Sequence, residues 1–380
     1  RRARARRPWT IGRWLLVGMI ALVVVLAGYT GYALLTAPRP GPNGTLTVYT
    51  YSSLLGGACP ASPTLAGVLA PFESAHGVTV DIVCPTGTLV NTLLAQKAAP
   101  VADVVVGLDE VTAPEAEANG LLAPYASPAQ AEIDPAIAAE LSPDHAVTPY
   151  EWGYLAIDYN ETFAAGAGGA IEHMSFPALA SNATWAHDLM IEDPTQDITG
   201  EEFLLWEIAY YDSVVHGDWT GFWKAVDPEL RVAADWSDAY DAFLGPTDPP
   251  AMVVSYSTDP ASADPPGPAS GFNATVSWSN GTAYGWRSVY GVGVVNGTHQ
   301  SALARAFVDW FLSPTVQEEL PTNEWEYPAN STVPLPPVFQ YAIDPGSITP
   351  LNGALGPSTI ASSLPGWIDE WQTLENQYGG

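Results

Sequence analysis

Short apolar runs alternate with amphipathic stretches along the first half of the chain. Runs rich in valine and isoleucine are typical of buried strands, and apolar positions that recur every three or four residues indicate helices packed on a sheet. This pattern predicts strands at Thr45–Thr50, Val78–Val83 and Ala102–Gly107, with helices at Thr64–Ser74 and Leu89–Ala98 between them. Pro71 is expected to bend or divide the first helix. Such βαβ alternation predicts an α/β fold in which helices cover a parallel sheet.

A second set of alternating elements begins after residues 149–159. It comprises predicted strands at Leu189–Glu192, Arg231–Ala234 and Ala251–Ser255, and helices at Gly200–Tyr211, at Trp219–Val226 and after Ser237 as N-cap. The run Asp259–Ser270 is rich in proline, alanine, serine and aspartate and predicts a surface loop. The chain then returns through Gly285–Val295 to helices at Ser301–Leu312, Pro314–Leu320 and Pro365 to about Gln377.

Two such sets predict two lobes. About 337 residues follow position 43, which is more than one typical core accommodates. We expect residues 45–150 and 290–380 to form lobe 1 and residues 151–289 to form lobe 2, with two crossings near 149–159 and 284–295 as the hinge. Open α/β sheets bind ligands beyond the carboxyl ends of their strands, so facing lobes would place two such edges around one cleft.

The N-terminus has a different pattern. Six arginines lie within the first 13 residues, and 22 uncharged residues follow from Trp14 to Leu35. At about 1.5 Å per residue this stretch spans roughly 33 Å as a helix, enough to cross a membrane. The positive-inside rule then predicts a cytoplasmic segment 1–13, a transmembrane anchor 14–35, a linker 36–44 and an extracellular main domain. The alternative is a long signal sequence cleaved near Thr36 or Ala37.

Glycosylation sequons and charge agree with an exterior location. Seven N-x-S/T sequons, all beyond the apolar stretch, begin at Asn43, Asn160, Asn182, Asn273, Asn280, Asn296 and Asn330. From Gly44 to Gly380 there are 5 bases and 41 acids, a formal charge of 5 − 41 = −36. This charge disfavours nucleic acid as a partner and attracts small cations. The alternative interpretation is adaptation to an acidic or salty medium.

The two cysteines, Cys59 and Cys84, have two interpretations. In an oxidising compartment they are expected to form a disulfide, and closing a 25-residue loop would stabilise the fold by about 3–4 kcal/mol on the chain-entropy model. The alternative is a nucleophilic thiol at Cys84, which follows a predicted strand.

Aromatic residues at the ends of predicted strands are the main candidates for a binding site. No familiar catalytic motif occurs, and the six histidines lack the spacing of metal ligands, so we expect no enzyme activity, no metal and no cofactor. Tyr51, Trp236 and Tyr256 follow predicted strands, and Trp325 lies in a proline-bounded turn. Core packing is the default role of a tryptophan. At a cleft edge, however, flat rings with a few carboxylates suit a planar organic cation.

Eight segments give the chain a resemblance to a known family. They are TVYTYSS (47–53), ADVVVGLDE (102–110), PYEWGYLAIDYN (149–160), EDPTQDITG (192–200), DWSDAYDAFL (235–244), VVSYSTDPA (253–261), PTNEWEYP (321–328) and WIDEWQ (367–372). In this order they resemble the thiamine-binding proteins of ABC importers. The resemblance implies a two-lobed type II periplasmic-binding-protein fold, thiamine or a related compound as ligand, and a membrane permease with its ATPase as partners.

The resemblance also implies site residues. Tyr51, Trp236, Tyr256 and Trp325 match aromatic positions of the family's cleft motifs, and Asp109 and Asp193 match its GLD and DP aspartates. Each aspartate has two open roles: facing the ligand, or forming a buried structural hydrogen bond.

The chain departs from the family at several positions. Where relatives have D-P-R-x-S, this chain has Asp193-Pro194-Thr195-Gln196-Asp197, and Ala58, Thr86 and Ser262 replace an expected tryptophan, acid and tyrosine. Loss of the arginine and serine favours unphosphorylated thiamine over its phosphates. The departures also leave open a same-fold binding protein for another cation such as a polyamine. A thiamine-degrading enzyme with a cysteine nucleophile is the third alternative.

Overall fold

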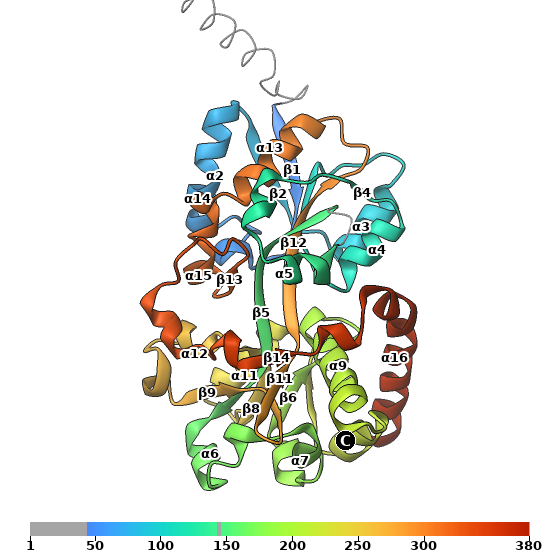
Figure 1. Ribbon diagram of the computed structural model, residues 1–380, viewed down its shortest axis with the longest axis vertical. Helices are drawn as coiled ribbons and strands as arrows, with labels where there is room; N and C mark the ends of the chain where they lie inside the picture. Colours follow the sequence, from blue (N-terminus) through green and yellow to red (C-terminus); the bar gives the residue numbers. More distant parts are fainter. Residues whose placement is uncertain (1–43, 143–145, 380) are drawn as a thin grey trace, which may run out of the picture.

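The computed structural model describes residues 44–142 and 146–379 and shows two lobes, one above the other in Figure 1. Within these residues the lobes share an 11-stranded sheet whose main path runs β2-β1-β3-β12-β5-β8-β6-β7. A separate three-stranded sheet has the order β10-β11-β14. The α/β fold expected from the alternating pattern is therefore confirmed, as are the two lobes.

Lobe 1 is built around parallel strands that are covered by helices. Val104–Leu108 (β3) is buried on both faces, because its run of valines leaves no polar side. β1 pairs with β2 and β3 in parallel. The lobe comprises β1 (Thr45–Tyr49), α2 (Pro63–His76), β2 (Thr79–Val83), α3 (Leu89–Gln96), β3, α4 (Thr112–Ala118), β4 (Leu122–Ala123), α5 (Pro135–Leu141), α13 (Ser301–Phe311), α14 (Pro314–Gln317), α15 (Leu320–Asn323) and β13 (Tyr327–Pro328).

Lobe 2 has its own hydrophobic core around the helix α9 (Ile198–Tyr210). The core includes Phe176, Trp206 and Trp223, each at most 1% exposed. The lobe comprises α6 (Glu161–Gly166), α7 (Phe176–Ala180), α8 (Ala183–His187), β6 (Leu189–Glu192), α9, α10 (Thr220–Val226), β7 (Arg231–Ala233), α11 (Trp236–Leu244), β8 (Met252–Tyr256), α12 (Asp259–Ser262), β9 (Phe272–Thr275), β10 (Ser277–Ser279), β11 (Thr282–Gly285), β14 (Ile348–Pro350) and α16 (Pro357–Tyr378).

Two long strands connect the lobes. β5 (Val147–Asn160) and β12 (Arg287–Val295) run between them in Figure 1 and pair antiparallel, with Arg287 opposite Tyr154 and Gly293 opposite Val147. The register shifts between Tyr290 and Gly291, which marks a bulge at the level where the lobes meet.

The C-terminal part differs from the expected lobe assignment. Residues 290–380 were assigned to lobe 1, but from Ile348 onward the chain packs on the core of lobe 2, where Trp371 contacts Trp223 with ring centroids 6.0 Å apart. Figure 1 shows α16 beside the lower lobe. In the described part, the chain therefore passes between the lobes a third time, between β13 and β14, and the expected two-crossing hinge is incomplete.

Several element boundaries also differ. Pro71 lies inside the single helix α2 instead of dividing it, and α16 begins at Pro357 and includes Pro365. The N-cap of α11 is Asp235 and not Ser237, because the Asp235 side chain accepts a hydrogen bond from the Asp238 amide. Part of the predicted loop 259–270 is the short helix α12.

The predicted cytoplasmic segment and the predicted anchor 14–35 lie outside the described residues. The same holds for Asn43 and for nearly all of the predicted linker. Within residues 44–142 and 146–379, no helix has both the length and the apolar character that a membrane span requires. Of the sequon asparagines in these ranges, Asn160, Asn280 and Asn296 are exposed, and Asn182 and Asn273 are partly exposed. Asn330 is buried in the folded domain.

Candidate functional site

The strand ends place most of the predicted residues at facing edges of the two lobes. Tyr51 follows β1 and Asp109 follows β3 in lobe 1. In lobe 2, Asp193 follows β6, Trp236 follows β7, and Tyr256 is the last residue of β8. Parallel strands bring their carboxyl ends to the same edge of a sheet, so this arrangement follows from the topology.

The hydroxyl of Tyr51 joins lobe 1 to the hinge. It lies 2.8 Å from the Tyr150 hydroxyl, 3.0 Å from Oε1 of Glu151 and 3.1 Å from Oε2 of Glu324. Tyr150 and Glu151 belong to β5, and Glu324 directly precedes Trp325. The Tyr51 side chain therefore connects the end of β1, the hinge strand and the segment that carries Trp325.

Tyr290 of β12 connects Tyr51 to lobe 2. Its ring centroid lies 6.1 Å from that of Tyr51, and its hydroxyl lies 3.2 Å from the hydroxyl of Tyr256. Tyr256 also approaches Thr199 at the start of α9, at 3.4 Å between oxygens. Tyrosines from both lobes and from the hinge thus form one continuous contact path.

Trp236 is held at the lobe 2 edge by two contacts. Its indole Nε1 donates a hydrogen bond of 2.9 Å to Ser255 Oγ, and Ser255 in turn donates to Asp259. One face of the indole stacks on Tyr240, with ring centroids 5.0 Å apart and an interplanar angle of 15°. These contacts fix the orientation of the indole ring while leaving Trp236 partly exposed.

Trp236 and Trp325 differ from the other tryptophans. Among those in the described ranges, only these two neither belong to a hydrophobic core nor pack against one. Trp325 also has a positive φ of 61°, an uncommon conformation for a residue other than glycine. Burial in a core therefore does not account for either side chain.

The two predicted aspartates make local hydrogen bonds. Oδ1 of Asp109 accepts from the amides of Val111 and Thr112, at 2.8 and 2.7 Å, and so fixes the turn before α4. Asp193 accepts from the Thr195 amide at 2.8 Å and from the Gln196 side chain at 2.6 Å. Asp109 nevertheless lies close to the other acids of the interlobe region, whereas no contact joins Asp193 to the tyrosine path.

A group of acids surrounds the tyrosine path, and we call it the interlobe acid cluster. Burial raises the pKa of Asp109 to about 6, of Glu151 to about 7 and of Glu110 to about 8, the last also because Asp109 is close. The pKa values of Glu202, Glu324 and Glu326 are well above the usual range, first through burial and then through neighbouring carboxylates. The members are Asp109, Glu110, Glu151, Glu202, Glu324 and Glu326.

No basic side chain neutralises this cluster in the part of the chain that the structure describes. The two arginine ion pairs there join Arg231 to Asp248 and Arg287 to Glu140, at 2.5 and 3.1 Å, outside the cluster. Burial without a cationic partner makes carboxyl groups costly to ionise, and a positive charge nearby would favour their ionised form. The region is therefore suited to a cationic guest.

Most of the cluster was not predicted from the sequence. Glu151 and Glu324 lie inside the motifs PYEWGYLAIDYN and PTNEWEYP, in which only the aromatic residue Trp325 was predicted to belong to the site. The available signal was an acid within an otherwise apolar run, which applies to Glu151 in β5 and to Glu202 in α9. A charged residue in such a run is rarely buried without a functional or structural reason.

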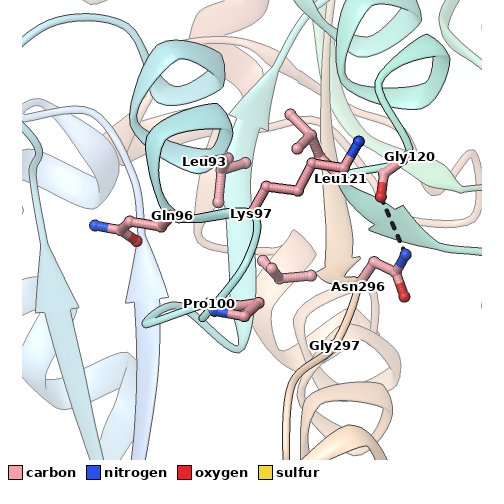
Figure 2. A pocket seen from close by; sticks show the side chains of 9 residues that line it. Leu93, Gln96, Lys97, Pro100, Gly120, Leu121, Asn296 and Gly297 are labelled. Carbon is pink, nitrogen blue, oxygen red and sulfur yellow. Dashed lines mark hydrogen bonds between the residues drawn. The ribbon is translucent and has the colours of Figure 1, made fainter.

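The cysteines and the surface pockets lie apart from this region. Cys59 and Cys84 form a disulfide, with Cα atoms 6.1 Å apart, and a surface pocket of about 440 Å³ lies beside Cys59. Figure 2 shows a smaller pocket, about 140 Å³, between the end of α3 and the end of β12. Lys97 and Asn296 line it, and Asn296 donates a hydrogen bond of 3.0 Å to the Gly120 carbonyl. None of the six predicted ligand-binding residues lines either of these pockets.

The fold and the sequence together define the class of the protein. Residues 60–318 match the family described as bacterial extracellular solute-binding protein, and the chain belongs to that family. The chain is 26% identical to a thiamine-binding periplasmic protein of Brucella suis over 344 residues, which cover 88% of this chain and 93% of the relative. The corresponding protein of Escherichia coli K12 is 27% identical over 330 residues, with coverage of 86% and 92%.

A solved structure agrees with these relatives. The structure described as a periplasmic thiamin binding protein aligns with a TM-score of 0.72 and 25% identity, covering 89% of this chain and 99% of that chain. The resemblance noted from the eight sequence segments is thereby confirmed.

Proposed function

We propose that this protein binds unphosphorylated thiamine, or a closely related thiazolium or pyrimidine compound, between its lobes. It would deliver the ligand to the permease of an ABC importer, as an extracellular component tethered by residues 14–35. The observation that carries the proposal is the interlobe acid cluster, which lacks a basic partner and lies among aromatic residues from both lobes. The names of the relatives support thiamine as the ligand.

Each part of the site has a distinct role in this proposal. Trp236 and Trp325 stack on the ligand rings, at about 0.5–2 kcal/mol for each cation–π contact. Tyr51 and Tyr256 provide hydroxyl groups from opposite lobes. The carboxyl groups offset the thiazolium charge, and contacts to both lobes make ligand binding favour the closed arrangement. Binding and release are sufficient for this role, and no bond is broken.

The start of α9 explains why the ligand should lack a phosphate. Helix N-termini commonly bind phosphate through free amides. Here Asp197 is the N-cap, and its Oδ1 accepts from the Thr199 amide at 2.9 Å. Glu201 follows in the first turn, and burial raises its pKa to about 8. Carboxyl groups thus occupy the place where a phosphate would bind.

The alternative functions have weaker support. A polyamine would also be attracted by the acid cluster, but it has no ring to stack on Trp236 and Trp325. A thiamine-degrading enzyme would need a nucleophilic thiolate, and the disulfide leaves neither cysteine with a free thiol.

Titration calorimetry with a competition series tests the proposal. We expect saturable binding of thiamine, weaker binding of its monophosphate and of hydroxymethylpyrimidine, and little binding of spermidine. Failure to bind any thiazolium or pyrimidine compound would remove the proposal, and preference for spermidine would establish the polyamine alternative.

A further inference from the structure

The contacts of the Tyr51 hydroxyl require a hydrogen that the two tyrosines cannot supply. Three oxygens lie within 3.1 Å of it: the Tyr150 hydroxyl, Oε1 of Glu151 and Oε2 of Glu324. A tyrosine hydroxyl has one hydrogen to donate, and an ionised carboxylate has none. Tyr150 can donate to Tyr51, and Tyr51 can donate to one carboxylate. The third contact is a hydrogen bond only if a carboxyl group carries a proton.

Among residues 44–142 and 146–379, no arginine ion pair involves Glu151 or Glu324. Two groups face the side chains of Tyr51, Glu151 and Glu324: Tyr150 of β5 and Glu326, which directly precedes β13. Asp259 of α12 interacts electrostatically with Glu326. The other carboxylate oxygen of Glu324, Oε1, accepts a hydrogen bond from the Leu55 amide. The hydroxyls of Tyr51 and Tyr150 favour an ionised Glu151, and the Tyr51 hydroxyl and the Leu55 amide favour an ionised Glu324. The two hydroxyls carry only one hydrogen each, and Glu326 and Asp259 are themselves acids, so without a ligand one proton stays on the Glu151–Glu324 pair.

We propose that Glu151 and Glu324 form a cation subsite that holds one proton when empty and releases it when an organic cation binds. This inference rests on the proposed function. The exchange is balanced: the carboxyl O–H bond breaks, the proton passes to solvent, and the positive charge of the thiazolium ring takes its place beside the carboxylate. The bound state therefore has the same net charge in the subsite as the empty state.

This arrangement explains how a site with so many acids can exist without a bound ligand. A pair that holds one proton avoids the repulsion between two buried carboxylates, and the second carboxylate forms only when a cation is present. It also couples ligand affinity to the pH outside the cell. Below the pKa of the pair, affinity for a monovalent cation should increase about tenfold per pH unit, since one proton is released.

The variant Glu324→Gln tests the proposal. Its side-chain amide oxygen can still accept from the Leu55 amide, and its NH₂ group supplies a permanent hydrogen to Tyr51, so the folded arrangement is retained. Calorimetry between pH 5.5 and 8 in two buffers of different ionisation enthalpy measures the protons released per thiamine bound. At pH 8 we expect about one for the wild-type chain, in which the pair keeps its proton, and little for Glu324→Gln, because the remaining Glu151, whose pKa burial raises to about 7, is already ionised there. Glu318→Gln, at an exposed position nearby, should match the wild type.

Two results would overturn the inference. One is thiamine binding to the wild-type chain at pH 8 without proton release, and the other is equal proton release by Glu324→Gln at that pH. If no thiamine binds at any pH, the proposed function fails instead. In that case, infrared difference spectroscopy of the ligand-free proteins tests directly whether the Glu151–Glu324 pair carries a proton. Other buried acids contribute to the protonated-carboxyl band in both proteins, so a band at pH 8 that is weaker in Glu324→Gln than in the wild type supports the inference, and identical spectra overturn it.

Discussion

Replacing Trp236 with alanine removes the proposed stacking surface of lobe 2 and leaves the rest of the fold intact. The helix α11 keeps its N-cap, because the Asp235 side chain and not Trp236 accepts the hydrogen bond from Asp238. Ser255 still donates to Asp259 after the indole is lost. The expected loss is therefore confined to the ligand: about 1–2 kcal/mol of stacking and cation–π energy, or about 5- to 30-fold in Kd.

The matched control is Trp185→Ala. Trp185 is also partly exposed in lobe 2, but it packs against the hydrophobic core, so its loss should lower the melting temperature and leave thiamine affinity within about twofold. Calorimetry gives Kd for both variants, and thermal unfolding gives their stability. Wild-type affinity in Trp236→Ala, or equal loss of affinity in both variants, would refute the assignment of Trp236 to the ligand.

Three further predictions concern stability. Burial raises the pKa of Glu151 to about 7 in the folded state, against about 4.3 when unfolded, so its stabilising contribution is full below about pH 4 and is lost as pH rises to 7. The melting temperature of the ligand-free protein should fall over this range, and Glu151→Gln should reduce the fall; a rise would contradict the pKa shift. Joint replacement of Cys59 and Cys84 by serine should lower the free energy of unfolding by about 3–4 kcal/mol in urea titrations, and no change would exclude a stabilising bridge. Asp109→Ala should cost about 1–2 kcal/mol by the same assay, because the carboxylate fixes the turn before α4; unchanged stability would show that these hydrogen bonds contribute little.

Local sequence patterns predicted the strands well and the long-range packing poorly. β6 has the predicted bounds, Leu189–Glu192, because a short apolar run ends at polar turn residues. β5 was predicted only as a crossing, because the buried acids Glu151 and Asp158 interrupt its apolar pattern. The position of α16 depends on contacts such as Trp371 with Trp223, which lie 148 residues apart in the sequence and leave no local signal.

The same distinction applies to the site. Strand ends indicated Tyr51, Trp236 and Tyr256 without knowledge of the tertiary structure, because the carboxyl edge of a sheet follows from strand direction. The meeting of Tyr51 with Glu151 and Glu324 depends on three segments that are distant in the sequence. No periodicity encodes such a meeting, so only the folded arrangement could place these acids together.

The two hinge strands also determine how the lobes can move. At Gly153 and Tyr154, β5 pairs with β12 alone, because its pairing with β13 ends at Trp152 and its pairing with β8 begins at Leu155. Two-stranded ribbons carry a stronger twist than wide sheets, and they deform most easily by winding or unwinding. Winding or unwinding at this point would rotate one lobe relative to the other about the ribbon axis, within the range that the third connection, between β13 and β14, permits. Such a rotation would change the distance between the hydroxyls of Tyr256 and Tyr290, which is 3.2 Å here, and so would act on the contact path between the lobes.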